Sequence, residues 1–203
     1  MAHTQDFAPN HLVYRDARPD EKNIIANLVI LTDGGIFEFL LHDLIPNVTS
    51  KQIVIKLVGE TDNVFSYKNW IVAEMNGKIF GAALSYSVDL LHSPEQEKFI
   101  PRERINHIRE FYLKKVPNSW YLHALATIPE ARNKGIGSQL IAHMKDLARE
   151  HGYNKLSLHV WADNFAAISL YKNLGFKIAD TIKIEPHHFL PHQNGMLLMY
   201  CDC

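Results

Sequence analysis

The sequence has little cysteine and almost no net charge. The first argues against a disulfide-rich secreted domain, and the second argues against a nucleic-acid-binding protein. Its two cysteines, Cys201 and Cys203, stand at the last residues and give no disulfide framework of the kind found in small secreted domains. We therefore expect a reduced, cytoplasmic protein, with both thiols in a frayed tail rather than in a metal site. A formal net charge of −1 argues against a nucleic-acid partner, because nucleic-acid-binding domains are usually clearly basic.

Long apolar runs are also missing. No segment approaches the roughly 18 apolar residues of a membrane-spanning helix, so no membrane partner is expected. The opening stretch MAHTQDFAPN lacks the basic start and apolar core of a signal peptide. What the chain does have is 203 residues, 47% of them apolar, which is enough to bury a core. Because no repeat, low-complexity tract or linker divides it, we expect one domain over residues 1–203.

The apolar pattern of the first half indicates helices followed by a hairpin. Asn76 and Gly77 join two β-rich runs, and Asn-Gly between apolar runs is the strongest short-range hairpin signal. Thr49 or Ser50 is expected to cap the third helix. Polar, partly helical residues 89–119 are expected to form an insertion over the sheet. The expected elements are a strand over 11–17, helices over 18–31, 36–46 and 47–60, and the hairpin over 69–87.

The second half alternates strands with helices. Its clearest element is a helix over 138–152, where apolar residues recur on one stripe and Gly152 provides the end. The other expected elements are strands over 120–128 and 155–162, a helix over 164–176, and a final pair of strands over 177–185 and 195–201. Helices, a hairpin and then alternating strands and helices together indicate one mixed α/β domain.

The segment ARNKGIGSQL, at residues 131–140, places two glycines where the strong helix begins. The first amides of a helix have no partner within it, and the helix dipole makes that end positive. Glycines let a phosphate or pyrophosphate oxygen approach these amides, and Arg132 and Lys134 add positive charge. The alternative is a tight turn whose glycines serve packing only. The segment lacks the G-K-S/T of a P-loop and the third glycine of the dinucleotide fingerprint.

Two motifs in this region resemble the GNAT superfamily of N-acetyltransferases. The first is its acetyl-CoA-binding signature Q/R-x-x-G-x-G/A, here at residues 132–137 after a strand and Pro-Glu. The second is a strand–Asn–helix–Tyr–Gly–Phe segment, whose positions here are Asn164, Ala167, Tyr171, Gly175 and Phe176. The resemblance covers about residues 118–178. It implies an α/β (α+β) fold with a mixed, mostly antiparallel central sheet of six to seven strands, flanked by helices and containing two splayed parallel strands.

The same resemblance implies that acetyl-CoA is the co-substrate and that no metal is needed. The backbone of Leu125, Ala126 and Thr127 would pair with the pantetheine arm as another strand would, and Asn164 would contact that arm or its water shell. The pyrophosphate would be bound by backbone amides of the glycine turn, whose members are Arg132, Asn133, Lys134, Gly135, Ile136, Gly137 and Ser138.

The implied reaction moves an acetyl group to a primary amine by direct attack in a ternary complex. The resemblance makes Tyr171 the general acid, since a phenol with a pKa near about 10 is protonated at neutral pH; a surface role is the alternative. His123, on the strand beside the thioester, is the first candidate for the base, with water as the alternative proton carrier. Tyr121 shares its face, at the position where histone-modifying members carry a catalytic glutamate. His159 is interpreted as structural or pocket lining.

Two loops are expected to form walls of the acceptor pocket. In residues 32–39, Asp33 and Glu38 are candidate anchors for an amine, and a plain glycine-rich loop between helices is the alternative. In the histidine-rich loop at 185–195, His187 and His188 are candidate substrate contacts, with a metal site as the alternative.

The acceptor itself is left open between a small molecule, a peptide N-terminus and a lysine side chain. The insertion at 89–119 would cap the pocket or contribute to a homodimer, and its arginines, Arg104 among them, are interpreted as a solvated face. A non-catalytic acetyl-CoA-binding or sensing module is the alternative function. The presence of both Tyr171 and the glycine turn favours the enzyme.

Overall fold

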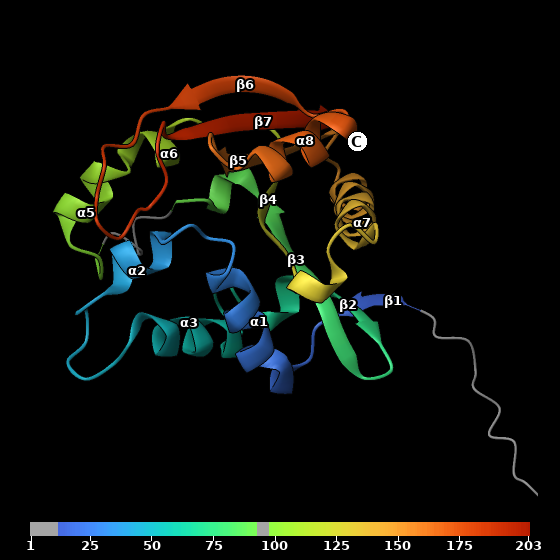
Figure 1. The fold of residues 1–203 in the computed structure, drawn as a ribbon, viewed down its shortest axis with the longest axis horizontal. Coiled ribbons are helices and arrows are strands. Elements are labelled where there is room, and N and C mark those ends of the chain that lie inside the picture. Colours follow the sequence, from blue (N-terminus) through green and yellow to red (C-terminus); the bar gives the residue numbers. More distant parts are fainter. Residues whose placement is uncertain (1–11, 93–97) are drawn as a thin grey trace, which may run out of the picture.

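The computed structural model describes residues 12–92 and 98–203 (Figure 1). Three expectations concern residues outside this description: the absence of a signal peptide, the start of the first strand at residue 11, and part of the insertion, at 93–97. None of the helices in the described part combines the length and the apolar composition that a bilayer crossing requires.

Seven strands form one sheet, in the spatial order β1-β2-β3-β4-β5-β7-β6. Every neighbouring pair is antiparallel except β4 and β5, which are parallel. The predicted mixed, mostly antiparallel sheet is therefore confirmed. The strands are β1 (Val13–Asp16), β2 (Trp70–Met75), β3 (Lys78–Ser87), β4 (Trp120–Thr127), β5 (Lys155–Trp161), β6 (Lys177–Ile182) and β7 (Met196–Asp202).

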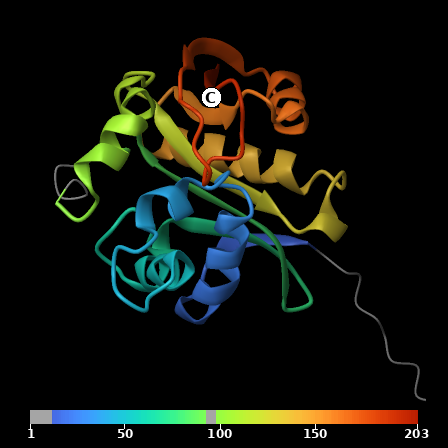
Figure 2. The same ribbon diagram turned by 60° about the vertical axis from the view of Figure 1, so that its left-hand side comes forward.

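Helices cover both faces of this sheet, and each face has its own apolar core (Figure 2). One face carries α1, α2, α3, α5 and α6, and the other carries α7 and α8. The helices are α1 (Lys22–Ile30), α2 (Ile36–Leu41), α3 (Ser50–Gly59), α5 (Arg102–His107), α6 (Arg109–Leu113), α7 (Ile136–Glu150) and α8 (Phe165–Asn173). Short 3-10 turns occupy Pro19–Glu21, Tyr67–Asn69, Val88–Leu90 and Pro129–Ala131.

Local sequence signals account for several of these boundaries. Asn76 and Gly77 have φ angles of 53° and 76°, as a two-residue turn with two left-handed positions requires, so the predicted hairpin is confirmed. Thr49 caps α3, because its side chain accepts from the amide of Gln52 while Gln52 accepts from the amide of Thr49.

The helix α2 ends at Leu41, well short of the predicted span 36–46. The His42 ring places Nδ1 2.9 Å from the carbonyl oxygen of Glu38, and Arg104 donates to the carbonyl of His42 at 2.8 Å. These side chains satisfy carbonyls that another helical turn would otherwise use. Arg104 is thus half-buried and caps a helix, so its interpretation as part of a solvated face is wrong.

The C-terminal cysteines do not form a frayed tail. Cys201 lies in β7 opposite Leu156, and it is only 3% exposed. The amide of Cys203 donates to the carbonyl of Asn154 at 3.0 Å. The expectation failed because β7 lies between β5 and β6, where it pairs with β6 as far as Tyr200 and with β5 as far as Asp202. Both thiols are free.

The two parallel strands separate soon after they meet. β4 and β5 are paired only where Trp120 faces Leu156 and Tyr121 faces Ser157. Beyond this point β4 continues to Thr127 and β5 continues to Trp161, and the two strands no longer pair with each other. The predicted pair of splayed parallel strands is therefore confirmed, and the backbone of β4 beyond Tyr121 keeps an edge that β5 does not cover.

Candidate active site

A cavity of about 1480 Å³ opens where β4 and β5 diverge. On one side it is lined by the segment leading into α7 and by the start of α8, and on the other by α1, α2, α3 and the loop that follows α3. The space therefore connects the two candidate regions of the sequence, the glycine turn and the loop at 32–39. Predicted cofactor residues that line it are Leu125, Thr127, Arg132, Asn133, Gly135, Ile136, Gly137, Ser138 and Asn164.

The glycine turn begins α7 two residues earlier than predicted. Gly135 precedes the helix with a φ of 79°, a left-handed conformation that is unfavourable for residues with a Cβ atom. A methyl group at Gly135 would meet nothing within 4 Å, so backbone conformation and not crowding requires the glycine. Arg132 and Lys134 are exposed beside this open helix end. The residues present therefore fit a diphosphate-bearing ligand such as coenzyme A.

The other predicted cofactor residues take positions at the edge of this region. Ala126 is 2% exposed and faces the core, and neither it nor Lys134 lines the cavity with its side chain. Asn164 is the residue before α8, and its Oδ1 accepts from the amide of Ala167 at 3.2 Å. The role of Asn164 in the fold is therefore to cap α8 at the cavity wall.

Tyr171 lines the cavity from α8. Its side chain is 8% exposed and its ring packs against Phe176 at a centroid distance of 5.4 Å. Burial raises the pKa of the Tyr171 phenol to about 12. The hydroxyl is therefore protonated at neutral pH, the state that a proton donor needs.

His123 lies at a bulge in β4. The register with β3 shifts so that Leu84 faces Ala124 while Ser85 faces Leu122, which leaves His123 without a partner in the ladder. Its Nδ1 lies 2.7 Å from the hydroxyl of Tyr86, a residue that the sequence did not single out. Burial lowers the pKa of His123 to about 4, so the imidazole is neutral at pH 7.

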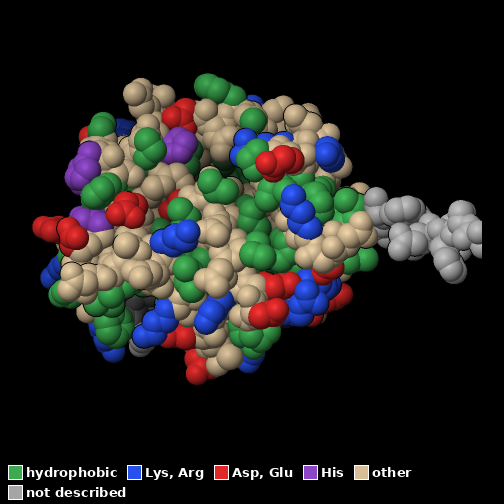
Figure 3. Space-filling model, turned by 60° about the horizontal axis from the view of Figure 1, so that its bottom comes forward, with side chains coloured by type: hydrophobic (Ala, Val, Ile, Leu, Met, Phe, Trp, Pro, Cys, Tyr) green, Lys and Arg blue, Asp and Glu red, His purple; other side chains and the backbone are tan. Residues whose placement is uncertain are grey.

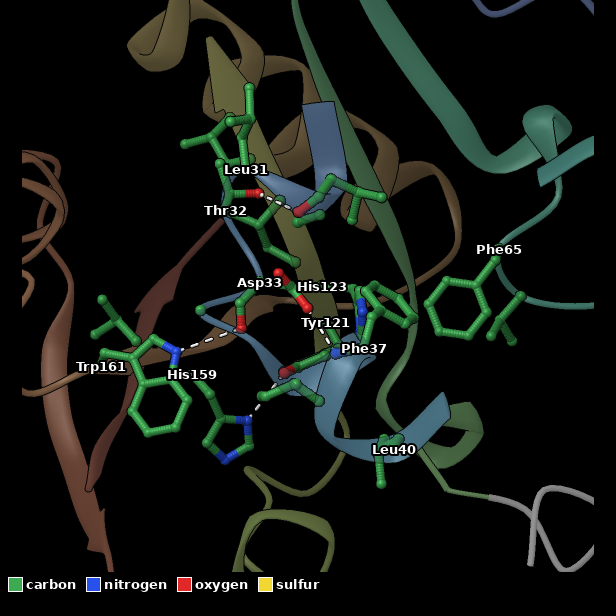
Figure 4. Close-up of a pocket in the computed structure, with 18 of the residues that line it drawn as sticks. Leu31, Thr32, Asp33, Phe37, Leu40, Phe65, Tyr121, His123, His159 and Trp161 are labelled. Atoms are coloured by element: carbon green, nitrogen blue, oxygen red, sulfur yellow. Dashed lines mark hydrogen bonds between the residues drawn. The ribbon is translucent and has the colours of Figure 1, made fainter. Parts of the chain in front are cut away.

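Tyr121 and His159 form a second pair on neighbouring strands. The Tyr121 hydroxyl lies 3.0 Å from Nδ1 of His159 (Figure 4). Nε2 of His159 lies 3.1 Å from the carbonyl oxygen of Lys114. Because a carbonyl only accepts, Nε2 carries the hydrogen and Nδ1 accepts from Tyr121. Burial raises the pKa of the Tyr121 phenol far above its usual value and lowers that of His159 to about 3. This pair supplies a neutral, fixed wall of the cavity.

Asp33 places a carboxylate in the cavity between α1 and α2. It accepts hydrogen bonds from the amides of Phe37 at 2.6 Å and Gly35 at 3.3 Å, and the Trp161 indole donates to its backbone carbonyl at 3.4 Å (Figure 4). Burial raises the pKa of Asp33 to about 6. Glu38, the other acid proposed from this segment, is exposed and does not line the cavity.

The histidine-rich loop contributes His192 to the cavity, while His187 and His188 lie outside its lining. Nδ1 of His192 lies 2.7 Å from Oδ1 of Asp163, and its ring stacks on Trp161 at a centroid distance of 4.7 Å. The rings of His187 and His188 contact each other at 4.3 Å. The histidines were a visible sequence signal, but only the fold selects the one that faces the cavity.

Histidine side chains gather at one end of the molecule (Figure 3). There the ring of His107 lies 5.6 Å from that of His187, and both contact Phe39. Within residues 12–92 and 98–203, no group of three or more His, Cys, Asp or Glu side chains is arranged to hold a metal ion. The rings of His107, His187 and Phe39 contact one another and form an aromatic cluster at this end.

Comparisons with solved structures agree with this architecture. An N-acetyltransferase from Staphylococcus aureus Mu50 matches with a TM-score of 0.67 at 23% identity, over 94% of this chain and 100% of that chain. The PaiA N-acetyltransferase from Thermoplasma acidophilum, solved in complex with coenzyme A, matches with a TM-score of 0.55 at 13% identity, over 95% and 99% of the two chains. At these identities the likeness shows the fold.

Sequence comparisons identify the family. The ribosomal protein bS18-alanine N-acetyltransferase of Escherichia coli K12 is 40% identical over 58 residues, which are 29% of this chain and 39% of that protein. Matches to curated relatives span between 19% and 39% of the relatives' own length. The profile of the Acetyltransferase (GNAT) family covers residues 54–176, more than half of the chain, including β4, the glycine turn and α8. The chain therefore belongs to the GNAT acetyltransferase family.

Proposed function

We propose that the protein transfers the acetyl group of acetyl-CoA to a primary amine, by direct attack of the amine in a ternary complex. The GNAT family uses acetyl-CoA as its acetyl donor, and a solved neighbour holds coenzyme A. The observation that carries the proposal is the continuity of one cavity from the head of α7 to Asp33 and His123. A continuous cavity lets donor and acceptor be held together in reacting geometry.

The residues that would hold coenzyme A form a continuous track. The backbone of Leu125, Ala126 and Thr127 lies on the edge of β4 that β5 leaves uncovered, so its polar groups are available to the pantetheine arm. Asn164 borders this track at the start of α8, and the amides of residues 132–138 would bind the pyrophosphate. When bound, acetyl-CoA supplies the activated carbonyl that the amine attacks.

We assign the general acid to Tyr171. Its protonated hydroxyl lies on the cofactor side of the cavity, where a departing thiolate would need a proton. Tyr121 is less suited to this role, because its hydroxyl donates to His159. The hydrogen bond from Tyr121 to His159 links β4 to β5 and keeps His159 in one tautomer.

We assign the proton acceptor to His123. The neutral imidazole accepts at Nε2 when Nδ1 carries the hydrogen, and Tyr86 is then the acceptor for Nδ1–H. A pKa of about 4 makes His123 a weak base, so it would pass the proton of the attacking amine on to solvent water rather than retain it. The rings of Phe65 and Phe37, with centroids at 5.0 and 6.5 Å, fix its orientation.

The decisive experiment combines calorimetry with thiol release. Coenzyme A is expected to bind, and acetyl-CoA is expected to release thiol in the presence of amines from a panel of small amines, peptide N-termini and lysine peptides. Tyr171→Phe should keep the affinity for coenzyme A and lower kcat by about 10²–10⁴-fold. Binding of acetyl-CoA without turnover on any amine would instead support the sensing module, and absence of binding would exclude both functions.

A further inference from the structure

The half of the cavity that faces α2 and α3 is lined mainly by hydrocarbon. We call it the acceptor limb and define it by six of its side chains from α2, α3 and the loops after them: Leu40, Leu44, Ile53, Leu57, Val64 and Phe65. These side chains are buried or partly buried, so they form walls rather than an exposed surface. An apolar wall of this kind favours an apolar guest, because burying its surface removes it from water.

One charge lies inside this limb. Among the charged side chains of the described residues that line it, Asp33 is partly buried, whereas Lys56, Glu60 and Asp62 are exposed at its outer rim. Lys56 is already within 3.8 Å of Glu60. The interior of the limb therefore offers an acid for a cation and offers no buried lysine or arginine for a carboxylate.

The volume leaves room for such a guest beside the cofactor. Pockets that bind drug-sized ligands have volumes of about 300–1,000 Å³. The cavity, at about 1480 Å³, exceeds that range while serving both the cofactor track and the limb. Figure 4 shows Asp33 between Trp161 and Phe37, with Phe65 beyond Phe37. The rings of Phe37 and Phe65 are in edge contact at a centroid distance of 5.4 Å, so Phe37 connects the charge to the apolar walls.

We propose that the acceptor is a monoamine with an aromatic or branched aliphatic body and no carboxylate, its ammonium at Asp33 and its body in the acceptor limb. This inference rests on the proposed acetyl transfer and names its substrate class. A long acyl chain is a poorer occupant, because a neutral chain would leave the Asp33 carboxylate facing hydrocarbon without a counter-charge.

The test compares three ligands that share one body. Calorimetry on the full chain, saturated with coenzyme A to prevent turnover, would use 2-phenylethylamine, L-phenylalanine and 2-phenylethanol. The amine is expected to bind at least tenfold more tightly than the amino acid, which adds a carboxylate, and than the alcohol, which lacks the cation. Equal or tighter binding of L-phenylalanine, or of the polar diamine putrescine, would overturn the inference.

Two variants separate the charge from the walls. Asp33→Asn keeps an oxygen for the amide of Phe37 and should remove the preference for amine over alcohol. Asp43→Asn is the matched control, since Asp43 is exposed, lies outside the cavity lining and has a φ of 52° that asparagine tolerates. Leu44→Gln should lower the affinities for 2-phenylethylamine and 2-phenylethanol by the same factor. This variant still tests the apolar walls if Asp33→Asn does not fold.

Acetyl transfer on the same panel distinguishes the two levels of the proposal. If acetyl groups go preferentially to polar or carboxylated amines, the inference about the limb is wrong while the transferase function stands. If acetyl-CoA neither binds nor is consumed, the proposed function fails, and amine binding measured without coenzyme A still reports on the limb. If octanoyl-CoA binds at least tenfold more tightly than acetyl-CoA and the amines do not bind, the limb takes an acyl chain and the inference is overturned.

Discussion

The hydroxyl of the buried Tyr86 on β3 lies 2.7 Å from Nδ1 of His123 on β4, and His123 is half-buried and lines the cavity. This hydrogen bond commits Nδ1 of His123 to the protein and leaves Nε2 as the nitrogen that would serve the proposed proton transfer. Tyr86 touches no reacting atom in this arrangement. It is a positioning residue, and its effect must pass through the imidazole.

Tyr86→Phe is therefore expected to lower kcat about tenfold or more while leaving the affinity for coenzyme A unchanged, because general-base steps contribute about 10²–10⁴-fold and the base would lose its orientation. Tyr200→Phe provides a comparison, since the Tyr200 ring is partly exposed on β7, contacts Lys155, and lies outside the cavity lining. The double variant Tyr86→Phe with His123→Gln should be no slower than His123→Gln alone. Additive losses would show that Tyr86 acts independently of His123.

The sequence was sufficient to predict most of the fold because its signals are local. Asn76-Gly77 specifies its own turn, Thr49 and Gln52 specify a helix start, and the glycine turn precedes an amphipathic helix. The length of α2 was not predictable in the same way. It depends on Arg104, which is remote in sequence and reaches the end of the helix only in the folded chain.

The residues of the candidate site likewise fall into those predictable from local motifs and those that depend on contacts between distant segments. Tyr171 and the glycine turn belong to contiguous motifs, and the structure places both at one cavity. Tyr86 requires the β3–β4 register, and the His192–Asp163 pair requires the C-terminal loop to return to the end of β5. A linear pattern contains no information on such contacts, which is why the histidine-rich loop indicated His187 and His188 instead.

The helix end at Arg104 gives a stability prediction. Arg104 donates to the carbonyls of Leu40 and His42 at 3.0 and 2.8 Å, and its NH2 group lies 3.0 Å from Nε2 of His42. Arg104→Ala should lower the free energy of unfolding by about 1.5–3 kcal/mol, the range for hydrogen bonds that involve a charged group. Urea denaturation would measure it, with the exposed Arg102→Ala as the comparison. Equal values for the two variants would contradict the capping role.

The charge of Asp33 gives a pH dependence for amine binding. Its pKa of about 6, raised by burial, means that the carboxylate is charged above pH 6 and loses its charge as the pH falls through that value. An alkylammonium with a pKa near about 10 stays charged throughout this range. The affinity for 2-phenylethylamine should therefore fall below pH 6, and His123, with a pKa of about 4, should not titrate between pH 5 and 8. Calorimetry from pH 5 to 8 should show an affinity independent of pH for 2-phenylethylamine with Asp33→Asn and for 2-phenylethanol with the wild type. If the affinity of the wild type for 2-phenylethylamine were also independent of pH, the charge of Asp33 would not contribute to binding.

Gly135 and Gly77, two of the glycines in the left-handed region, allow a test that separates the stability of the fold from the binding of the cofactor. Both have positive φ angles, 79° and 76°, and a methyl group at either would meet nothing within 4 Å. Alanine at either position should therefore cost about 1–2 kcal/mol of stability through backbone strain alone. Only Gly135 precedes α7, so Gly135→Ala should also weaken coenzyme A binding, whereas Gly77→Ala, in the β2–β3 turn, should not. Denaturation and calorimetry on the pair would show this, and equal affinities for coenzyme A would mean that the head of α7 does not hold the diphosphate.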